Sequence, residues 1–193
     1  MSQFEFVQIS FAIILGLGVT SILASLGDQI RLRHIQKLSP LHVCSQCLLL
    51  YSLLVWLWGF WATREINWSI SIFIFHALSP VFLALAAHMS KIEISQNGEA
   101  AQTQYFRNRQ VFYGFWALAS LIGIGQTQFY VYIGQLDISS SIPLMILRAI
   151  GLTSLITLAV SGKSIVHWVF LTVLTMIYSS VIFTFFFSLS GST

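Results

Sequence analysis

Long apolar runs alternate with short polar stretches along the whole chain. Each run has about 20 residues, the length at which an α-helix crosses a hydrocarbon core of about 30 Å. Because a segment in lipid must satisfy its own backbone hydrogen bonds, such runs predict helices. The six predicted helices cover residues 6–26, 41–63, 68–89, 111–133, 142–160 and 165–189. The pattern therefore predicts an all-α, polytopic integral membrane protein, with residues 1–193 forming a single transmembrane domain.

The composition narrows the class further. With 193 residues, of which 56% are hydrophobic and 8% charged, the chain leaves no room for a separate soluble domain. The net charge of +3 is divided among several polar segments, so no nucleic-acid partner is expected. The N-terminus lacks the basic region of a signal peptide, and the first run is predicted as a retained helix.

The charges of the polar segments predict an orientation. The segments after the first, third and fifth runs contain most of the basic residues. These are Arg31, Arg33, Lys37, Lys91, Arg107, Arg109 and Lys163. The positive-inside rule places these segments in the cytoplasm and both termini outside. The longest polar segment, residues 91–110, is predicted to be a cytoplasmic loop on which a soluble partner can dock.

Small residues recur at four-residue spacing in two of the runs. They are Ala12, Gly16, Thr20 and Ala24 in the first run, and Ala149, Thr153, Thr157 and Ser161 in the fifth. Small residues on one face let helices approach closely in lipid, either within one chain or between subunits. We therefore expect the protein to form a homo-oligomer.

The two halves of the chain share a short pattern. Residues 15–20 read LGLGVT and residues 122–127 read IGIGQT, and both the second and the fifth run open on Pro-Leu. Three helices per half would make the halves an inverted repeat, the arrangement of many transporters. The alternative is that glycine and threonine recur by chance in apolar sequence.

Arg148 and His76 are the main candidates for a functional role, because ionisable groups inside lipid are costly. Arg148 is the charged residue well inside a run, and it either extends to the outer headgroups or serves as a buried anion contact or structural partner. His76 shares a helix face with Ser79 and Pro80, and Pro80 frees the carbonyl of residue 76. The simpler alternative for His76 is a hydrogen bond to a neighbouring helix.

The fourth run adds Gln126 and Gln128, which point about 200° apart on a helix, so only one can face a given partner. If the third, fourth and fifth helices adjoin, these side chains line one polar pocket in the outer half. The predicted pathway residues are Arg148, His76, Ser79, Gln126 and Gln128.

The sequence gives little support for a metal site or for catalysis. Cys44 and Cys47, with His42 nearby, have a spacing used by zinc ligands, but a second ligand pair is missing, so two packed thiols are predicted. The chain has none of the sequence patterns of nucleophilic or metal-dependent hydrolases, and its six acidic residues all lie outside the runs. No enzyme, catalytic residue, metal or cofactor is expected.

Residues 4–6 (FEF), 14–20 (ILGLGVT) and 105–109 (YFRNR) resemble a group of small bacterial polytopic inner-membrane proteins of unknown function. The likeness covers the first helix and the segment before the fourth. It implies a bacterial inner-membrane location and implies no activity.

Two functions remain as hypotheses. The first is an oligomeric membrane protein that forms a solute or ion pathway, either a channel or a transporter. The second is a non-catalytic anchor or sensor subunit that binds a cytoplasmic partner through residues 91–110. A pathway needs a water-accessible polar cavity, whereas an anchor can be a dry bundle with an ordered basic face.

Overall fold

The computed structural model is a bundle of six helices, and it describes residues 3–31, 39–60, 63, 66, 68–91, 101–134 and 138–190. No strand occurs within these residues. The helices are α1 (Gln3–Arg31), α2 (Pro40–Phe60), α3 (Ile70–Met89), α4 (Ala101–Tyr132), α5 (Ile138–Val160) and α6 (Ser164–Ser190). The all-α prediction is confirmed.

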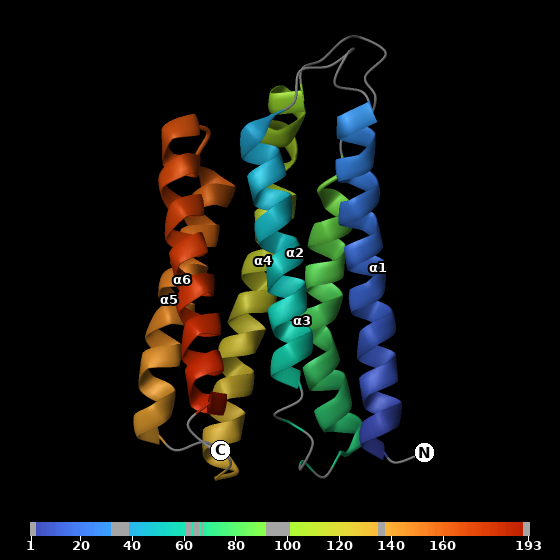
Figure 1. The fold of residues 1–193 in the computed structure, drawn as a ribbon, viewed down its shortest axis with the longest axis vertical. Helices are drawn as coiled ribbons and strands as arrows, with labels where there is room; N and C mark the ends of the chain where they lie inside the picture. Colours follow the sequence, from blue (N-terminus) through green and yellow to red (C-terminus); the bar gives the residue numbers. More distant parts are fainter. Residues whose placement is uncertain are drawn as a thin grey trace.

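The helices run along one long axis, with α1 at one edge of the bundle and α5 and α6 at the other (Figure 1). α4 packs most extensively, against α3 on one side and α5 on the other, and no backbone contact joins α3 to α5 in the described part of the chain. The first residues of α1 and the last of α6 lie at the same end, which we call the terminal end (Figure 1). The opposite end, with Arg31, Lys91 and Lys163 next to the helix ends, is called the basic end.

Four helices have a stretch long and apolar enough to cross a membrane: α1, α2, α3 and residues 141–160 of α5. Only 17–33% of the residues in these stretches are buried in the bundle. Their outward faces carry large apolar side chains, among them Ile13, Leu17, Ile74 and Ile156. Exposed apolar surface of this extent is typical of contact with lipid, so the chain has the features of a membrane protein.

α4 is longer than its apolar run. It begins at Ala101, ten residues before the predicted start at residue 111, so residues 101–110 are helical and not the second half of a loop. One face of this extension, which includes Ala101, Gln104 and Tyr105, is buried against the rest of the bundle. Residues 92–100 of the predicted loop lie outside the described residues.

Of the two packing alternatives for the small-residue stripe of α1, within the chain or between subunits, the structure does not show the first. The stripe residues of α1 (Ala12, Gly16, Thr20, Ala24) are all exposed, so they form no packing interface inside the chain. The close approach lies instead at Gly18, where an added Cβ would be 3.3 Å from the Ala84 Cα of α3 and from the Leu53 side chain of α2.

The inverted repeat is not confirmed. α1 packs along α3, yet the equivalent pair in the second half, α4 and α6, has no backbone contact within the described residues. These two helices meet only through side chains, such as the stacked rings of Trp116 and Tyr178, whose centroids are 6.5 Å apart. Gly16 is exposed, whereas its counterpart Gly123 lies beside Arg148. The two halves therefore pack differently.

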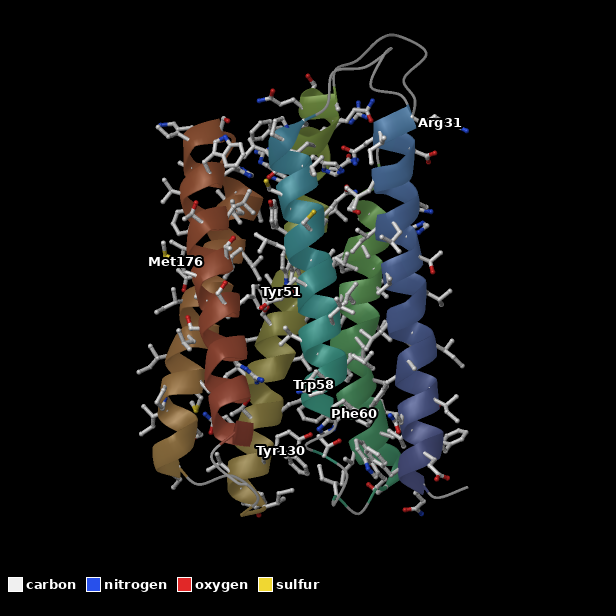
Figure 2. The ribbon with its side chains drawn as sticks, viewed as in Figure 1. Arg31, Tyr51, Trp58, Phe60, Tyr130 and Met176 are labelled. Carbon is white, nitrogen blue, oxygen red and sulfur yellow. The ribbon has the colours of Figure 1, made fainter. Side chains whose placement is uncertain are left out.

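The core has two apolar parts. The larger one fills the middle of the bundle, with Leu49, Leu53, Leu83 and Trp116 almost fully buried. The smaller is an aromatic cluster at the terminal end around Phe11, whose ring stacks on Phe73 and meets Phe60 edge to face at 4.7 Å. Figure 2 shows Phe60 at this end, below the middle layer that contains Tyr51.

Candidate functional site

His76 is buried between α3 and α4, with 2% of its surface exposed. Its Nδ1 lies 2.9 Å from the Ile72 carbonyl and its Nε2 lies 2.6 Å from the Tyr130 hydroxyl. Because a carbonyl only accepts, Nδ1 carries the proton and Nε2 of the neutral ring accepts from Tyr130. Tyr130 extends from α4 near the terminal end (Figure 2).

Two further polar side chains join α3 to α4. The Ser79 hydroxyl donates to the Ala119 carbonyl at 3.0 Å. The Gln126 amide donates to the Phe75 carbonyl at 3.2 Å and reaches the His76 carbonyl at 3.5 Å. The second of these is the carbonyl that Pro80 deprives of its helical partner. A side chain of the neighbouring helix thus replaces the lost backbone donor.

Arg148 lies on the other side of α4. It is the eleventh of the 23 residues of α5, about 15 Å from the start of that helix. Its half-buried guanidinium donates to the Gly123 carbonyl and the Thr127 hydroxyl of α4. An added Cβ at Gly123 would lie 3.7 Å from the nearer guanidinium nitrogen, an ordinary van der Waals contact. The side chain of Arg148, near the middle of α5, therefore turns to α4.

The predicted site residues thus fall into two groups. His76, Ser79 and Gln126 lie between α3 and α4, and Arg148 lies between α4 and α5. Tyr130 belongs to the first group, since its hydroxyl is hydrogen bonded to His76. Gln128 is exposed on the α5 side, where its amide contacts the Met145 sulfur at 3.2 Å. The prediction of one shared pocket depended on the third, fourth and fifth helices adjoining, and α4 adjoins both α3 and α5, whereas α3 and α5 share no backbone contact within the described residues.

Sequence reasoning missed Tyr130 and Thr127. Both are common residues in membrane helices, so the residue type alone does not identify them as part of the site. Their spacing could have done so, because Tyr130 follows Gln126 by four residues and Thr127 follows Gly123 by four, which places each pair on one helix face.

A second polar cluster lies toward the basic end and centres on Gln46, which is fully buried. Its amide nitrogen donates to the Ser25 hydroxyl at 2.7 Å and to the carbonyl and hydroxyl of Ser90, each at 3.1 Å. Its oxygen accepts from the Gln29 amide at 2.8 Å. One side chain of α2 therefore joins α1 to the end of α3.

A third set of hydrogen bonds joins α2, α4 and α6. The Tyr105 hydroxyl lies 2.6 Å from Nδ1 of His167 and 2.8 Å from the Tyr113 hydroxyl, which in turn lies 2.7 Å from Ser45. Nε2 of His167 is 2.9 Å from the Ser161 carbonyl. Tyr105 precedes the apolar part of α4, and burial raises the pKa of its phenol, so the hydroxyl stays protonated.

His42 differs from every histidine above. It is 4% exposed, yet both of its ring nitrogens lack a hydrogen-bond partner within the described residues. It borders a small pocket at the basic end. The nearby thiols are free, with Cys44 partly buried and Cys47 exposed, and the described part of the chain holds no group of three metal-ligating side chains.

The chain is thus an all-helical bundle in which buried polar side chains join neighbouring helices, and four of its helices have a stretch long and apolar enough to cross a membrane. No family model, no curated protein and no solved structure matches the chain. Functional assignment therefore depends on the geometry of the molecule itself.

Proposed function

We propose that this protein forms a pathway for small solutes or ions across a bacterial inner membrane, with both termini outside. The observation that carries the proposal is the position of Arg148, a cation at the middle of α5. All six acidic residues of the chain lie outside the apolar runs, and the partners of Arg148 among the described residues are the Gly123 carbonyl and the Thr127 hydroxyl. A cation without a counter-charge inside lipid attracts anions and water, and such residues commonly mark ion or solute pathways.

The polar clusters on both sides of the core support the same proposal. His76, Tyr130 and Gln126 lie toward the terminal end, and the Gln46 and Tyr105 clusters lie toward the basic end. Between them the interior is filled by apolar side chains such as Leu49, Leu83 and Trp116. In this conformation the pathway is closed, and its opening requires the helices around α4 to move apart.

The outward-facing stripe of α1 supports an oligomer. Its small residues are exposed, and the hydroxyl of Thr20 bonds back to the Gly16 carbonyl at 2.8 Å. A smooth face without free polar groups is suited to close packing against a helix of a second subunit.

Substitution of Arg148 tests the pathway. Purified protein in liposomes loaded with potassium chloride should release the salt faster than empty liposomes, as measured by conductivity. Arg148→Leu should reduce the rate at least tenfold because the charge that draws an anion inward is gone, and Arg148→Lys should retain part of it. Lys163→Leu, at the basic end, serves as the control with wild-type release.

A second function has one observation in its favour. Residues 101–110 form ordered turns of α4 beyond its apolar part, with Gln102, Thr103 and Arg107 exposed. Such a helix offers a soluble partner a rigid surface, as expected for an anchor or sensor subunit. If the wild-type protein releases salt no faster than empty liposomes, and osmotic swelling in glycerol shows no solute flux either, the anchor is the better reading.

A further inference from the structure

We propose that the pocket beside His42 binds one oxygen of a phosphate group, supplied by an anionic phospholipid or by solution. The inference is independent of the pathway proposed above, because the pocket lies at the basic end and shares no residue with the Arg148 site.

The pocket lies where three helices meet. His42 is in the first turn of α2, Ser90 and Lys91 follow the last residue of α3, and Gln104 and Asn108 belong to the first turns of α4. It is partly open, and its interior has room for about one water molecule. A single ligand oxygen fits inside, and the rest of the ligand must remain at the mouth.

His42 is the reason to expect a ligand. Both ring nitrogens are buried and unpaired within the described residues. A buried polar group without a partner is costly and rare in native structures. Among the described residues, the Ser90 backbone interacts with the imidazole without a hydrogen bond of normal geometry, and the Tyr105 hydroxyl bonds to Tyr113 and His167. A ligand oxygen in the pocket would give the imidazole a partner.

The balance of charges around the pocket favours an anion. The carbonyls at the end of α3, which would repel an anion, already accept hydrogen bonds at Ala86, Ala87, His88 and Ser90. The ammonium of Lys91 and the amides of Gln104 and Asn108 supply donors. The N-terminus of α2 adds the positive end of a helix dipole. Among the described residues that line the pocket, none is acidic.

Depth in the membrane points to phosphate. The apolar stretch of α3 ends at Met89 and that of α2 begins at Pro40, so the pocket lies where lipid headgroups meet the ends of the helices. One phosphate oxygen would enter beside His42, and the remaining charge would lie against Lys91. The imidazole then has a partner and the anion has a counter-ion.

The experiment measures binding through the ring of His42. In the full-length protein in detergent, titration with inorganic phosphate should shift the 15N resonances of the His42 ring, and the same shift should appear without added phosphate in nanodiscs of phosphatidylglycerol but not in phosphatidylcholine. A shift in the first arm alone identifies soluble phosphate, and a shift in the second alone identifies the lipid. Either result supports the proposal.

Variants separate binding from folding. His42→Phe removes the unpaired nitrogens at similar volume, and Lys91→Gln removes the charge. Each should weaken phosphate binding about tenfold, the effect of losing one charge-assisted hydrogen bond. His88→Phe and Lys163→Gln, which alter exposed residues outside the pocket, should leave it unchanged. Unmoved His42 resonances in both arms would show that the pocket holds water alone and would overturn the proposal, whether or not the His42 variant folds.

Discussion

At the scale of single residues, the interior is organised by polar side chains that bond to a neighbouring helix. His76, Gln126 and Gln46 each reach across to another helix, and Arg148 binds the backbone and a hydroxyl of α4. Lipid offers a side chain no hydrogen-bond partner, so each such group must find one in the protein. The result is that polar residues, few in number, decide which helices stay together.

Gln46 provides a direct test of this role. Gln46→Leu leaves Ser25, Gln29 and Ser90 without their shared partner, so the free energy of unfolding should fall by about 2 kcal/mol, since interhelical hydrogen bonds in membranes contribute about 0.6 kcal/mol each. Unfolding in sodium dodecyl sulfate, followed by circular dichroism, measures the change. Gln128→Leu is the matched control, because the exposed Gln128 contacts only the Met145 sulfur. Equal losses in both variants would contradict the assignment of a structural role to Gln46.

The site was predictable only in part at this scale. Arg148 and His76 were identifiable because ionisable residues are rare inside apolar runs. Their partners were not, because Thr127 and Tyr130 are ordinary residues whose importance depends on which face of α4 meets which helix. The sequence predicts that only one of Gln126 and Gln128 faces a given neighbouring helix. In the structure, Gln126 faces α3.

At the scale of helices, α3 and α4 form an extensively packed pair that several polar side chains join. α3 continues through Pro80, and the carbonyl that loses its helical donor lies near the Gln126 amide of α4. The helix therefore tolerates proline because its neighbour compensates, as is general for proline in membrane helices. The two positions should be energetically coupled.

A double-mutant cycle measures that coupling. Gln126→Leu should destabilise the wild-type protein, and it should cost about 0.5–1 kcal/mol less when Pro80→Ala has restored the backbone donor for the His76 carbonyl. Detergent unfolding of the four proteins gives the coupling energy. The same cycle with Pro143→Ala, in α5, should be additive because Pro143 does not affect the His76 carbonyl that the Gln126 amide approaches. Simple additivity for Pro80 and Gln126 would mean that the amide does not replace the lost hydrogen bond.

The helices themselves were largely predictable from apolar runs, since each of the six runs corresponds to one helix of the structure. The main exception is the start of α4. Residues 101–110 carry no long apolar stretch, so hydropathy indicates a loop there. The buried positions Ala101, Gln104 and Tyr105, with Phe112 further along, follow helical spacing, and this weaker signal marks the extension.

At the scale of the whole molecule, the packing of the halves was beyond the sequence. A shared Gly-rich pattern predicts equivalent surroundings for Gly16 and Gly123, yet Gly16 is exposed and Gly123 adjoins Arg148. A pattern of small residues indicates that another helix can approach closely at that face. It does not indicate which helix does so. The charge distribution is more informative about the whole molecule. The sequence predicts that Arg31, Lys91 and Lys163 lie on one side, and in the structure all three are next to the helix ends opposite the terminal end.

The orientation in the membrane is the last prediction. In a background with Cys44 and Cys47 changed to serine, a cysteine at position 138 should react with an impermeant thiol reagent on intact cells, whereas a cysteine at position 97 should react only after the membrane is opened. The reason is that basic segments stay in the cytoplasm, which places residue 138, at the terminal end, outside. The cysteine-free background should remain unlabelled in both conditions. The opposite labelling pattern would place His42 and its pocket at the outer surface, and the source of the phosphate would then be the outer leaflet or the external medium.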